Sequence, residues 1–212
     1  MDTDAALANG LARDLEAAFP ILVANHQDRL YTIALRLLGD RRDAEEVAQD
    51  ALVRAFRAMG GYPRERVAAL RLRPWLASIT VNLARNRRRR LDDRRPPSSL
   101  DPMVAAGFDI PADGRGAPQA TADRRETKRE LAAALLGLTP AVRAAIVLRH
   151  VDGLSLAEAA EALGKPQGTI KAQVHRGLRE LRAHLEAQPE PTLTTRTTIT
   201  GTHLAPALEA IR

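Results

Sequence analysis

The stretch from Thr139 to Arg182 constrains the fold more than any other part of the chain. Ser155, followed three residues later by Glu158, has the pattern of a capping box, in which each side chain bonds the backbone amide of the other residue. Apolar residues then recur at the spacing of one helix face: Leu156, Ala159, Ala160 and Leu163. Gly164 and Pro166 follow and terminate a helix. The sequence therefore predicts a helix of about two turns and then a tight turn.

A second helix is predicted to begin at Thr169. Its apolar stripe comprises Ile170, Val174, Leu178 and Leu181. The opposite side carries small and cationic residues: Thr169, Ala172, His175, Arg176 and Arg179. Such a helix fits the major groove of B-DNA, where basic side chains can bond guanine and small side chains permit close approach. We interpret the two helices as a helix-turn-helix; the alternative is an ordinary helical hairpin with a solvated basic face.

Composition supports a polyanionic partner. The 212 residues carry a formal net charge of +6 and a sequence pI near 10.6. Acids outnumber bases in residues 1–50, whereas residues 71–95 contain nine arginines, so we expect two different charged surfaces. With no cysteine there are no disulfides or thiolate metal sites. Five histidines lack ligand spacing, which implies no metal or other cofactor, and are expected at the surface or an interface: His26, His150, His175, His184 and His203.

Other function classes lack their sequence signals. The N-terminus has no basic segment followed by an apolar one, and no apolar run approaches the ~20 residues that cross a bilayer. We therefore expect a cytoplasmic protein with no membrane insertion. There is no paired nucleophile and base, P-loop or dinucleotide fingerprint, so we do not expect an enzyme.

The periodicity of the first half is helical, and strand signals are nearly absent, which predicts an all-α fold. We expect helices over 5–18 and 21–38, separated near Pro20, and a third from Asp40 to Gly60. The third should bury one stripe: Ala44, Val47, Ala48, Ala51, Leu52, Ala55 and Phe56. After a loop over 62–71, a fourth helix is expected from Trp75 to about residue 91, with Pro74 at its start.

The chain is predicted to form two small helical domains, over residues 1–95 and 123–187. Residues 96–122 change to Pro, Gly, Ala, Ser and Asp with little periodicity, which is typical of a flexible interdomain linker. The second domain should contain four helices, the second of them starting at Thr139-Pro140. Residues 188–212 are rich in threonine and proline, and we expect a disordered tail.

Three sequence blocks, in order, resemble a known family. They are Asp43–Asp50 (DAEEVAQD), Trp75–Asn86 (WLASITVNLARN), and Gly168–Lys171 followed by Val174–Arg176. These blocks resemble extracytoplasmic-function (ECF, group IV) RNA polymerase sigma factors of the sigma-70 family. The resemblance implies a σ2-like bundle and a σ4-like helix-turn-helix domain. It also implies a protein that binds core RNA polymerase and directs promoter-specific initiation at −10 and −35 elements.

The resemblance assigns roles to individual residues. Polymerase contacts, on the β′ clamp helices, would come from Asp43, Glu46, Gln49 and Asp50, and the β flap would be a further contact. The −10 element would meet Asn82, Arg85, Asn86, Arg87, Arg88, Arg89 and Arg90, with the asparagines on a base and its backbone and the arginines on phosphates. The −35 element would meet Thr169, Lys171, Ala172, His175, Arg176 and Arg179. This chain departs from the family at Ala172, often serine, and at Gln173, often arginine, so its base preference is open.

Several alternatives stay open at this stage. Trp75 opens an amphipathic helix, so we interpret it as a core residue rather than a stacking platform. The family habit suggests an anti-sigma factor between the two domains. The rival function is a helix-turn-helix regulator that binds an operator without polymerase, and a third is a general nucleic-acid packaging protein.

Overall fold

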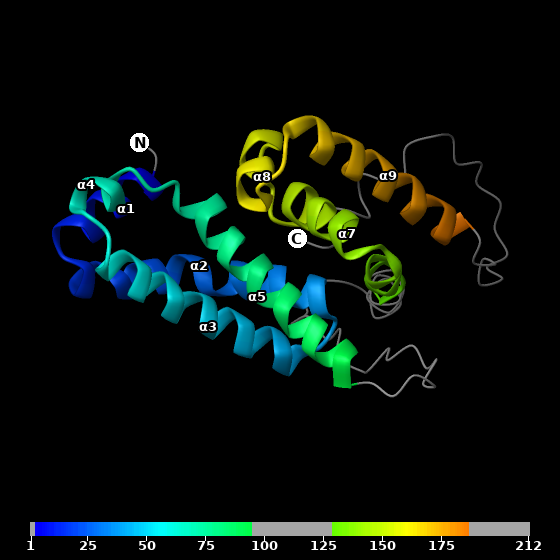
Figure 1. Ribbon diagram of the computed structural model, residues 1–212, viewed down its shortest axis with the longest axis horizontal. Helices are drawn as coiled ribbons and strands as arrows, with labels where there is room; N and C mark the ends of the chain where they lie inside the picture. Colours follow the sequence, from blue (N-terminus) through cyan, green and yellow to red (C-terminus); the bar gives the residue numbers. More distant parts are fainter. Residues whose placement is uncertain (1–2, 95–128, 187–212) are drawn as a thin grey trace, which may run out of the picture.

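The computed structural model describes residues 3–94 and 129–186, and every regular element in these two ranges is a helix (Figure 1). The predicted all-α class, with a helical half on each side of a connecting segment, is confirmed. The predicted linker over 96–122 and the predicted tail over 188–212 lie outside the described residues.

The first two helices are α1 (Thr3–Arg13) and α2 (Leu15–Leu38). The break predicted near Pro20 is therefore wrong: the chain breaks at Asp14, and Pro20 lies inside α2. Asp14 is the N-cap of α2, and its carboxylate accepts the amide hydrogen of Ala17 at 3.0 Å. A side-chain cap fixes the helix start, whereas a proline in the second turn removes only one backbone hydrogen bond.

Helix α3 (Arg41–Gly60) follows a sharp reversal of the chain. Gly39 ends α2 with φ of +80°, and Asp40 caps α3 by accepting the amide hydrogen of Asp43 at 2.8 Å. The apolar stripe of α3 is buried as predicted except at its edge. Phe56 remains 36% exposed and contacts Phe19 edge-on, with ring centroids 4.9 Å apart.

The loop predicted over 62–71 is partly helical. It contains α4 (Arg64–Ala68), and α5 (Leu72–Arg94) begins three residues before Trp75. Pro74 is thus the third residue of α5 rather than its first. The start differs from the prediction because proline is tolerated throughout the first helical turn, where backbone amides have no partners within the helix.

The second half contains the helices expected there. They are a helix over 129–137, α7 (Pro140–Ile146), α8 (Leu156–Leu163) and α9 (Gln167–Glu186). Helix α7 continues into η1 (Val147–Val151), one π-helical turn. Helix α9 begins two residues earlier than predicted, because the carbonyl of Pro166 already accepts the amide hydrogens of Thr169 and Ile170.

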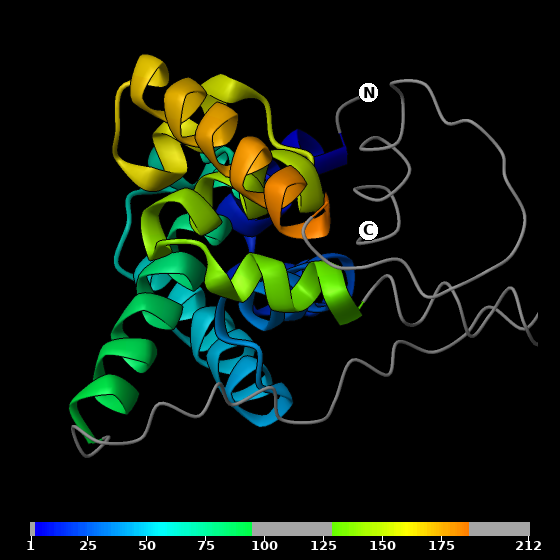
Figure 2. The same ribbon diagram turned by 90° about the vertical axis from the view of Figure 1, so that its right-hand side faces the viewer.

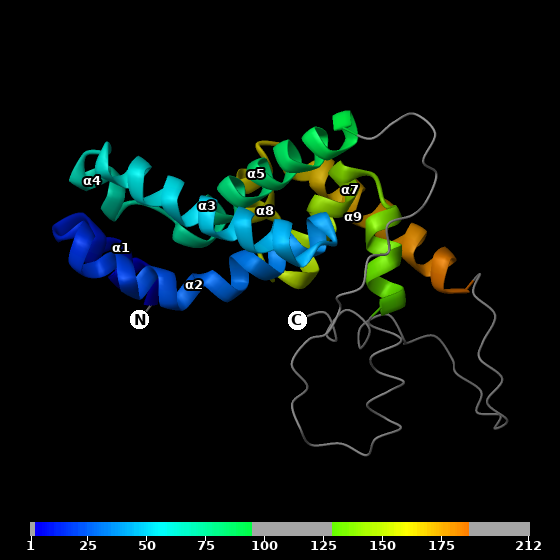
Figure 3. The same cartoon turned by 90° about the horizontal axis from the view of Figure 1, so that it is seen from below.

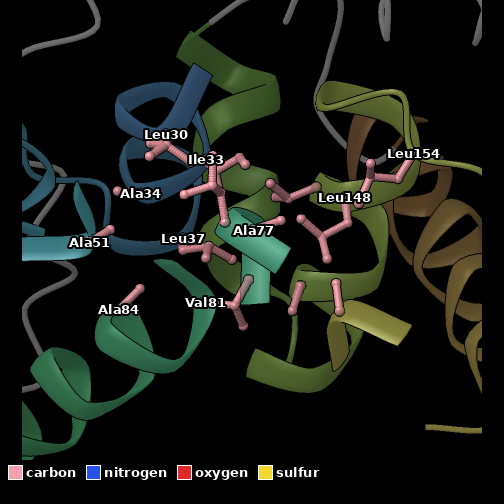
Figure 4. Packing of buried hydrophobic residues seen from close by; sticks show 14 of the residues in the cluster. Leu30, Ile33, Ala34, Leu37, Ala51, Ala77, Val81, Ala84, Leu148 and Leu154 are labelled. Atoms are coloured by element: carbon pink, nitrogen blue, oxygen red, sulfur yellow. The ribbon is translucent and has the colours of Figure 1, made fainter. Parts of the chain in front are cut away.

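The two halves pack against each other. Helices α2, α3 and α5 form a bundle, with α1 and α4 at one end of it, and the second half lies across α5 and α2 (Figures 1 and 3). Buried apolar residues form one cluster that runs through both halves; Figure 4 shows Leu37 of α2 and Val81 of α5 opposite Leu148 and Leu154. The first and second halves therefore share part of their core.

A buried arginine reinforces this junction. Arg143 of α7 is 2% exposed and donates hydrogen bonds to the carbonyls of Leu135 and Leu138, each at 2.8 Å, and to the carbonyl of Leu136. It also reaches the first half, where it donates to the carbonyl of Leu37 at 2.8 Å. One guanidinium thus donates to carbonyls at the C-terminal ends of two helices, where backbone acceptors lack partners from a following helical turn.

Candidate nucleic-acid interface

The helix-turn-helix is built as the sequence predicted. In α8, Ser155 Oγ accepts the Glu158 amide hydrogen at 3.2 Å, and the Glu158 carboxylate accepts the Ser155 amide hydrogen at 2.8 Å. These hydrogen bonds are the first cause of a lowered Glu158 pKa. Gly164 ends α8 with φ of +60°, a conformation that suits glycine, so α9 starts within three residues.

Helix α9 presents its polar side to solvent. All six residues predicted to read the −35 element are exposed: Thr169, Lys171, Ala172, His175, Arg176 and Arg179. The opposite side buries Ile170, Gly177 and Leu181. Gly177 lies against α7, where an added Cβ would come within 2.8 Å of both Val142 and Ile146 side chains. Close packing on α7 therefore fixes which side of α9 faces outward (Figure 2).

Helix α5 carries the second predicted nucleic-acid surface. Of the seven residues predicted to meet the −10 element, two are half-buried, Arg87 and Arg88. The other five are exposed: Asn82, Arg85, Asn86, Arg89 and Arg90. Counted along a helix, Asn82, Asn86 and Arg89 lie on one face. The structure thus brings most of the predicted −10 residues onto one exposed, cationic face, without Arg87.

The side chain of Arg87 points to α3 instead. Its Nε lies 2.9 Å from Asp43 Oδ1, and its guanidinium also lies 2.8 Å from Glu46 Oε2. The hydrogen bond to Asp43 is the main reason that the pKa of Arg87 is raised. Two of the acids predicted to meet polymerase are thus paired with an arginine predicted to meet DNA. Gln49 and Asp50, one turn further along α3, are exposed.

Aromatic and cationic side chains gather at the start of α5. The Tyr62 and Trp75 ring centroids are 6.4 Å apart, and the Arg66 guanidinium lies 3.8 Å from the Tyr62 ring centroid. Trp75 is half-buried and packs against the core, in agreement with its interpretation as a core residue. The sigma-factor resemblance implies that the loop over 60–71 forms part of a pocket for an extruded −10 base, but sequence reasoning did not single out Tyr62 or Arg66 within it.

Ion pairs that sequence reasoning did not predict join the two halves. Arg71, just before α5, donates to Glu158 at 2.9 Å and to Glu161 at 2.8 Å. Arg29 of α2 donates to the fully buried Asp152 carboxylate at 2.6 Å, and Arg73 donates to the Asp152 backbone carbonyl at 2.7 Å. No local pattern marks these pairs, because their partners are 79 to 123 residues apart.

The prediction that the histidines lie at the surface or an interface fails at His26, whereas His203 lies outside the described residues. His26 is 4% exposed, with its Nε2 atom 3.5 Å from a carboxylate oxygen of Asp4. Burial is the first cause of its lowered pKa, and Arg29 and Arg73 lower it further. Within residues 3–94 and 129–186, no three His, Asp or Glu side chains gather as a metal site would require. No helix in those ranges is long and apolar enough to cross a bilayer.

Known families cover both halves of this arrangement. Residues 22–94 match Sigma-70 region 2, and residues 128–181 match Sigma-70, region 4. The ECF RNA polymerase sigma factor SigW of Bacillus subtilis is 33% identical over 174 residues, which is 79% of this chain and 89% of that protein. The chain belongs to the ECF sigma factor family.

Other members differ in length and closeness. The ECF RNA polymerase sigma factor SigE of Mycolicibacterium smegmatis is 35% identical over 176 residues, 80% of this chain but 63% of that protein. Among solved structures, CnrH in complex with the cytosolic domain of CnrY covers 89% of this chain and 100% of its own, with 26% identity and a TM-score of 0.63. The sigma factor RpoE of Bartonella quintana, solved with the anti-sigma factor NepR, shares the fold at 23% identity and a TM-score of 0.56, over 81% of this chain and 98% of its own.

Membership confirms the fold and function expected from the three sequence blocks. As an ECF sigma factor, the chain serves promoter-specific transcription initiation with RNA polymerase. The family is not enzymatic. A regulator that binds an operator without polymerase would not account for the match to region 2, which contains both α3 and α5.

Proposed function

We propose that this sigma factor reads two promoter elements with two separate exposed faces while α3 docks on polymerase. The observation that carries the proposal is the pair of cationic, solvent-facing surfaces on α5 and α9, one in each half of the chain. Basic surfaces of this kind bind phosphates without sequence choice, and neutral polar side chains beside them read bases. Each half then supplies one element-specific contact.

The docking surface on core polymerase is assigned to α3. Gln49 and Asp50 are exposed and free to meet a basic partner such as the β′ clamp helices. Asp43 and Glu46 act through their shared partner Arg87, which holds them in place on the same side of the bundle. The second half would contact the β flap.

The −10 element is assigned to the exposed face of α5. Asn82 and Asn86 are the candidates for base contact, because amide side chains both donate and accept hydrogen bonds. Arg85, Arg88, Arg89 and Arg90 would bind phosphates. Arg87 is assigned to α3 rather than to DNA, since its guanidinium pairs with the carboxylates of Asp43 and Glu46.

The −35 element is assigned to α9, lying in the major groove. Lys171, Arg176 and Arg179 can donate to bases or phosphates, and Ala172 permits close approach. Thr169 and His175 complete the exposed surface. We further propose that the chain acts as a specificity subunit without catalytic activity of its own, in the cytoplasm beside polymerase. An anti-sigma factor is a proposed partner, as for the sigma factor RpoE solved with the anti-sigma factor NepR.

The test compares binding of core polymerase and of DNA. The protein and core polymerase should co-elute on size exclusion, and promoter fragments should be retained only when both are present. Replacing Gln49 and Asp50 by alanine should weaken core binding by at least about five-fold, since central interface residues often cost more than 1 kcal/mol on truncation. Glu16→Ala, an exposed change on α2, is the matched control. Sequence-specific binding to duplex DNA without polymerase would instead support the operator-binding regulator.

A further inference from the structure

The acids of α8 occupy a cationic site at the start of α5. Arg71 is 53% exposed at its side chain, yet both of its amino groups are engaged, one by Glu158 at 2.9 Å and one by Glu161 at 2.8 Å. The carboxylates lie one helical turn apart on α8, so they present four oxygens to a single guanidinium. Arginine forms this paired arrangement equally well with the oxygens of a phosphate.

Arg71 also lies in line with the predicted −10 residues. The amide hydrogen of Trp75 bonds the Arg71 carbonyl at 3.1 Å, so Arg71 continues the helical spacing of α5. Eleven residues separate Arg71 from Asn82, which is three turns plus about 20°, or roughly 16 Å along the same face. A DNA strand that follows this face past Asn82 therefore arrives at Arg71.

In the structure the two halves are packed together, an arrangement that we call closed. The closed protein cannot contact both promoter elements at once. The names −10 and −35 place the two elements about 25 base pairs apart, or roughly 85 Å of duplex. Helices in contact have axes about 8–10 Å apart, and α8 contacts both α5 and α9. The two halves must therefore separate before α5 and α9 each reach an element. The connection over 95–128 has 34 residues, whose full extension reaches roughly 110 Å.

We propose that Arg71, with Arg73 beside it, is a phosphate-binding site for the single-stranded DNA of the −10 element, and that Glu158 and Glu161 fill it in the closed protein as mimics of DNA phosphates. The proposal rests on the function proposed above for α5. Opening the two halves uncovers the site, and DNA bound there prevents them from closing. The buried Arg29–Asp152 pair adds to the same closed state.

A phosphate site that Glu158 and Glu161 fill makes a different prediction from ion pairs that only hold the two halves together, which we call a latch. Removing the acids opens the protein and uncovers the site, so affinity for DNA rises. Removing Arg71 also opens the protein but destroys the site, so affinity does not rise. A latch without a phosphate site predicts a rise in both cases, because either change breaks the same ion pairs.

The experiment measures binding of full-length protein to fluorescein-labelled single-stranded DNA, by anisotropy and without polymerase. Glu158→Gln/Glu161→Gln keeps the capping box, since glutamine also serves at that position. Two exposed ion pairs are lost, so affinity should rise about two- to ten-fold. Glu180→Gln/Glu186→Gln, on the exposed side of α9, makes the same net charge change and should have less effect.

The arginine variant completes the test. Arg71→Ala should bind no more tightly than the unchanged protein, and its salt dependence should fall by about 0.7 in the slope of log K against log salt. The chain has no cysteine, so spin labels at Arg57→Cys and Arg182→Cys report the separation of the halves directly. Both the glutamine and the Arg71→Ala variants should lengthen that distance.

Three outcomes overturn the proposal. One is tighter binding by Arg71→Ala, which leaves only a latch. Another is an equal gain in the control pair, which reduces the effect to net charge. The third is an unchanged distance in the variants, which shows that these ion pairs do not hold the closed state. Because polymerase is absent, these results are independent of the proposed function, which fails instead if core polymerase is not recruited to promoters.

Discussion

Replacing Arg143 by methionine should destabilise the second half of the chain far more than an exposed arginine would. Methionine has a similar stem but no donors, so the change removes the hydrogen bonds to the carbonyls of Leu37, Leu136 and Leu138. The Leu135 carbonyl also loses the guanidinium but keeps the Leu138 amide hydrogen at 3.2 Å. Each buried acceptor left unsatisfied costs about 1–3 kcal/mol, and the costs are not additive. With three acceptors affected, we expect a loss of about 3–5 kcal/mol in the free energy of unfolding.

Urea denaturation followed by circular dichroism at 222 nm measures this loss, with Arg182→Met on the exposed side of α9 as the control. A loss of that size shifts the melting temperature by roughly 10 °C in a chain of this length. Hydrogen exchange should show faster exchange in α7, α8 and α9 than in α3. A change below about 1 kcal/mol would show that water replaces the guanidinium at these carbonyls and that Arg143 contributes little to stability.

Three further predictions test local features of the fold and of the binding surfaces. Gly177→Ala should destabilise the protein by about 1–3 kcal/mol and weaken −35 binding, because the methyl group overlaps α7, whereas Gly168→Ala, with open space around it, should be neutral or stabilising in thermal melts. Ser155→Ala should cost about 1 kcal/mol at neutral pH. Because the Glu158 pKa is lowered in the folded state, the ionised carboxylate contributes to the free energy of unfolding above the ordinary glutamate pKa. This contribution is lost as pH falls through the folded pKa. In unfolding measured against pH, Ser155→Ala should therefore lose less stability at acid pH than the unchanged protein does. Arg87→Ala should weaken core polymerase binding without reducing the salt slope of binding to −10 DNA; a smaller slope would return this arginine to the DNA surface.

The local signals in the sequence were sufficient for the helix-turn-helix. A capping box, a glycine at the end of α8 and a regular apolar stripe act within a few residues, and each is present in the structure. The same holds for the exposed faces of α5 and α9. Where two local signals compete, as at Asp14 and Pro20, the capping side chain determines the boundary.

Contacts between distant residues could not be predicted in the same way. Arg87 belongs to a run of arginines that predicts a phosphate surface, and only the packing of α3 on α5 turns this one side chain toward Asp43. Arg71 and Arg143 find their partners 87 to 106 residues away in the other half of the chain. No periodicity or spacing rule reports which faces of two helical units meet.

Run-off transcription tests directly whether this protein directs RNA polymerase to promoters. Purified protein is added to bacterial core RNA polymerase on a library of promoter fragments, and the transcripts are mapped. We expect transcripts that start at defined sites, require both core polymerase and this protein, and are lost when Asn82 and Asn86 are both replaced by alanine. Transcripts that start at the same sites without the protein, or no defined start at any fragment, would show that the protein does not select promoters through α5.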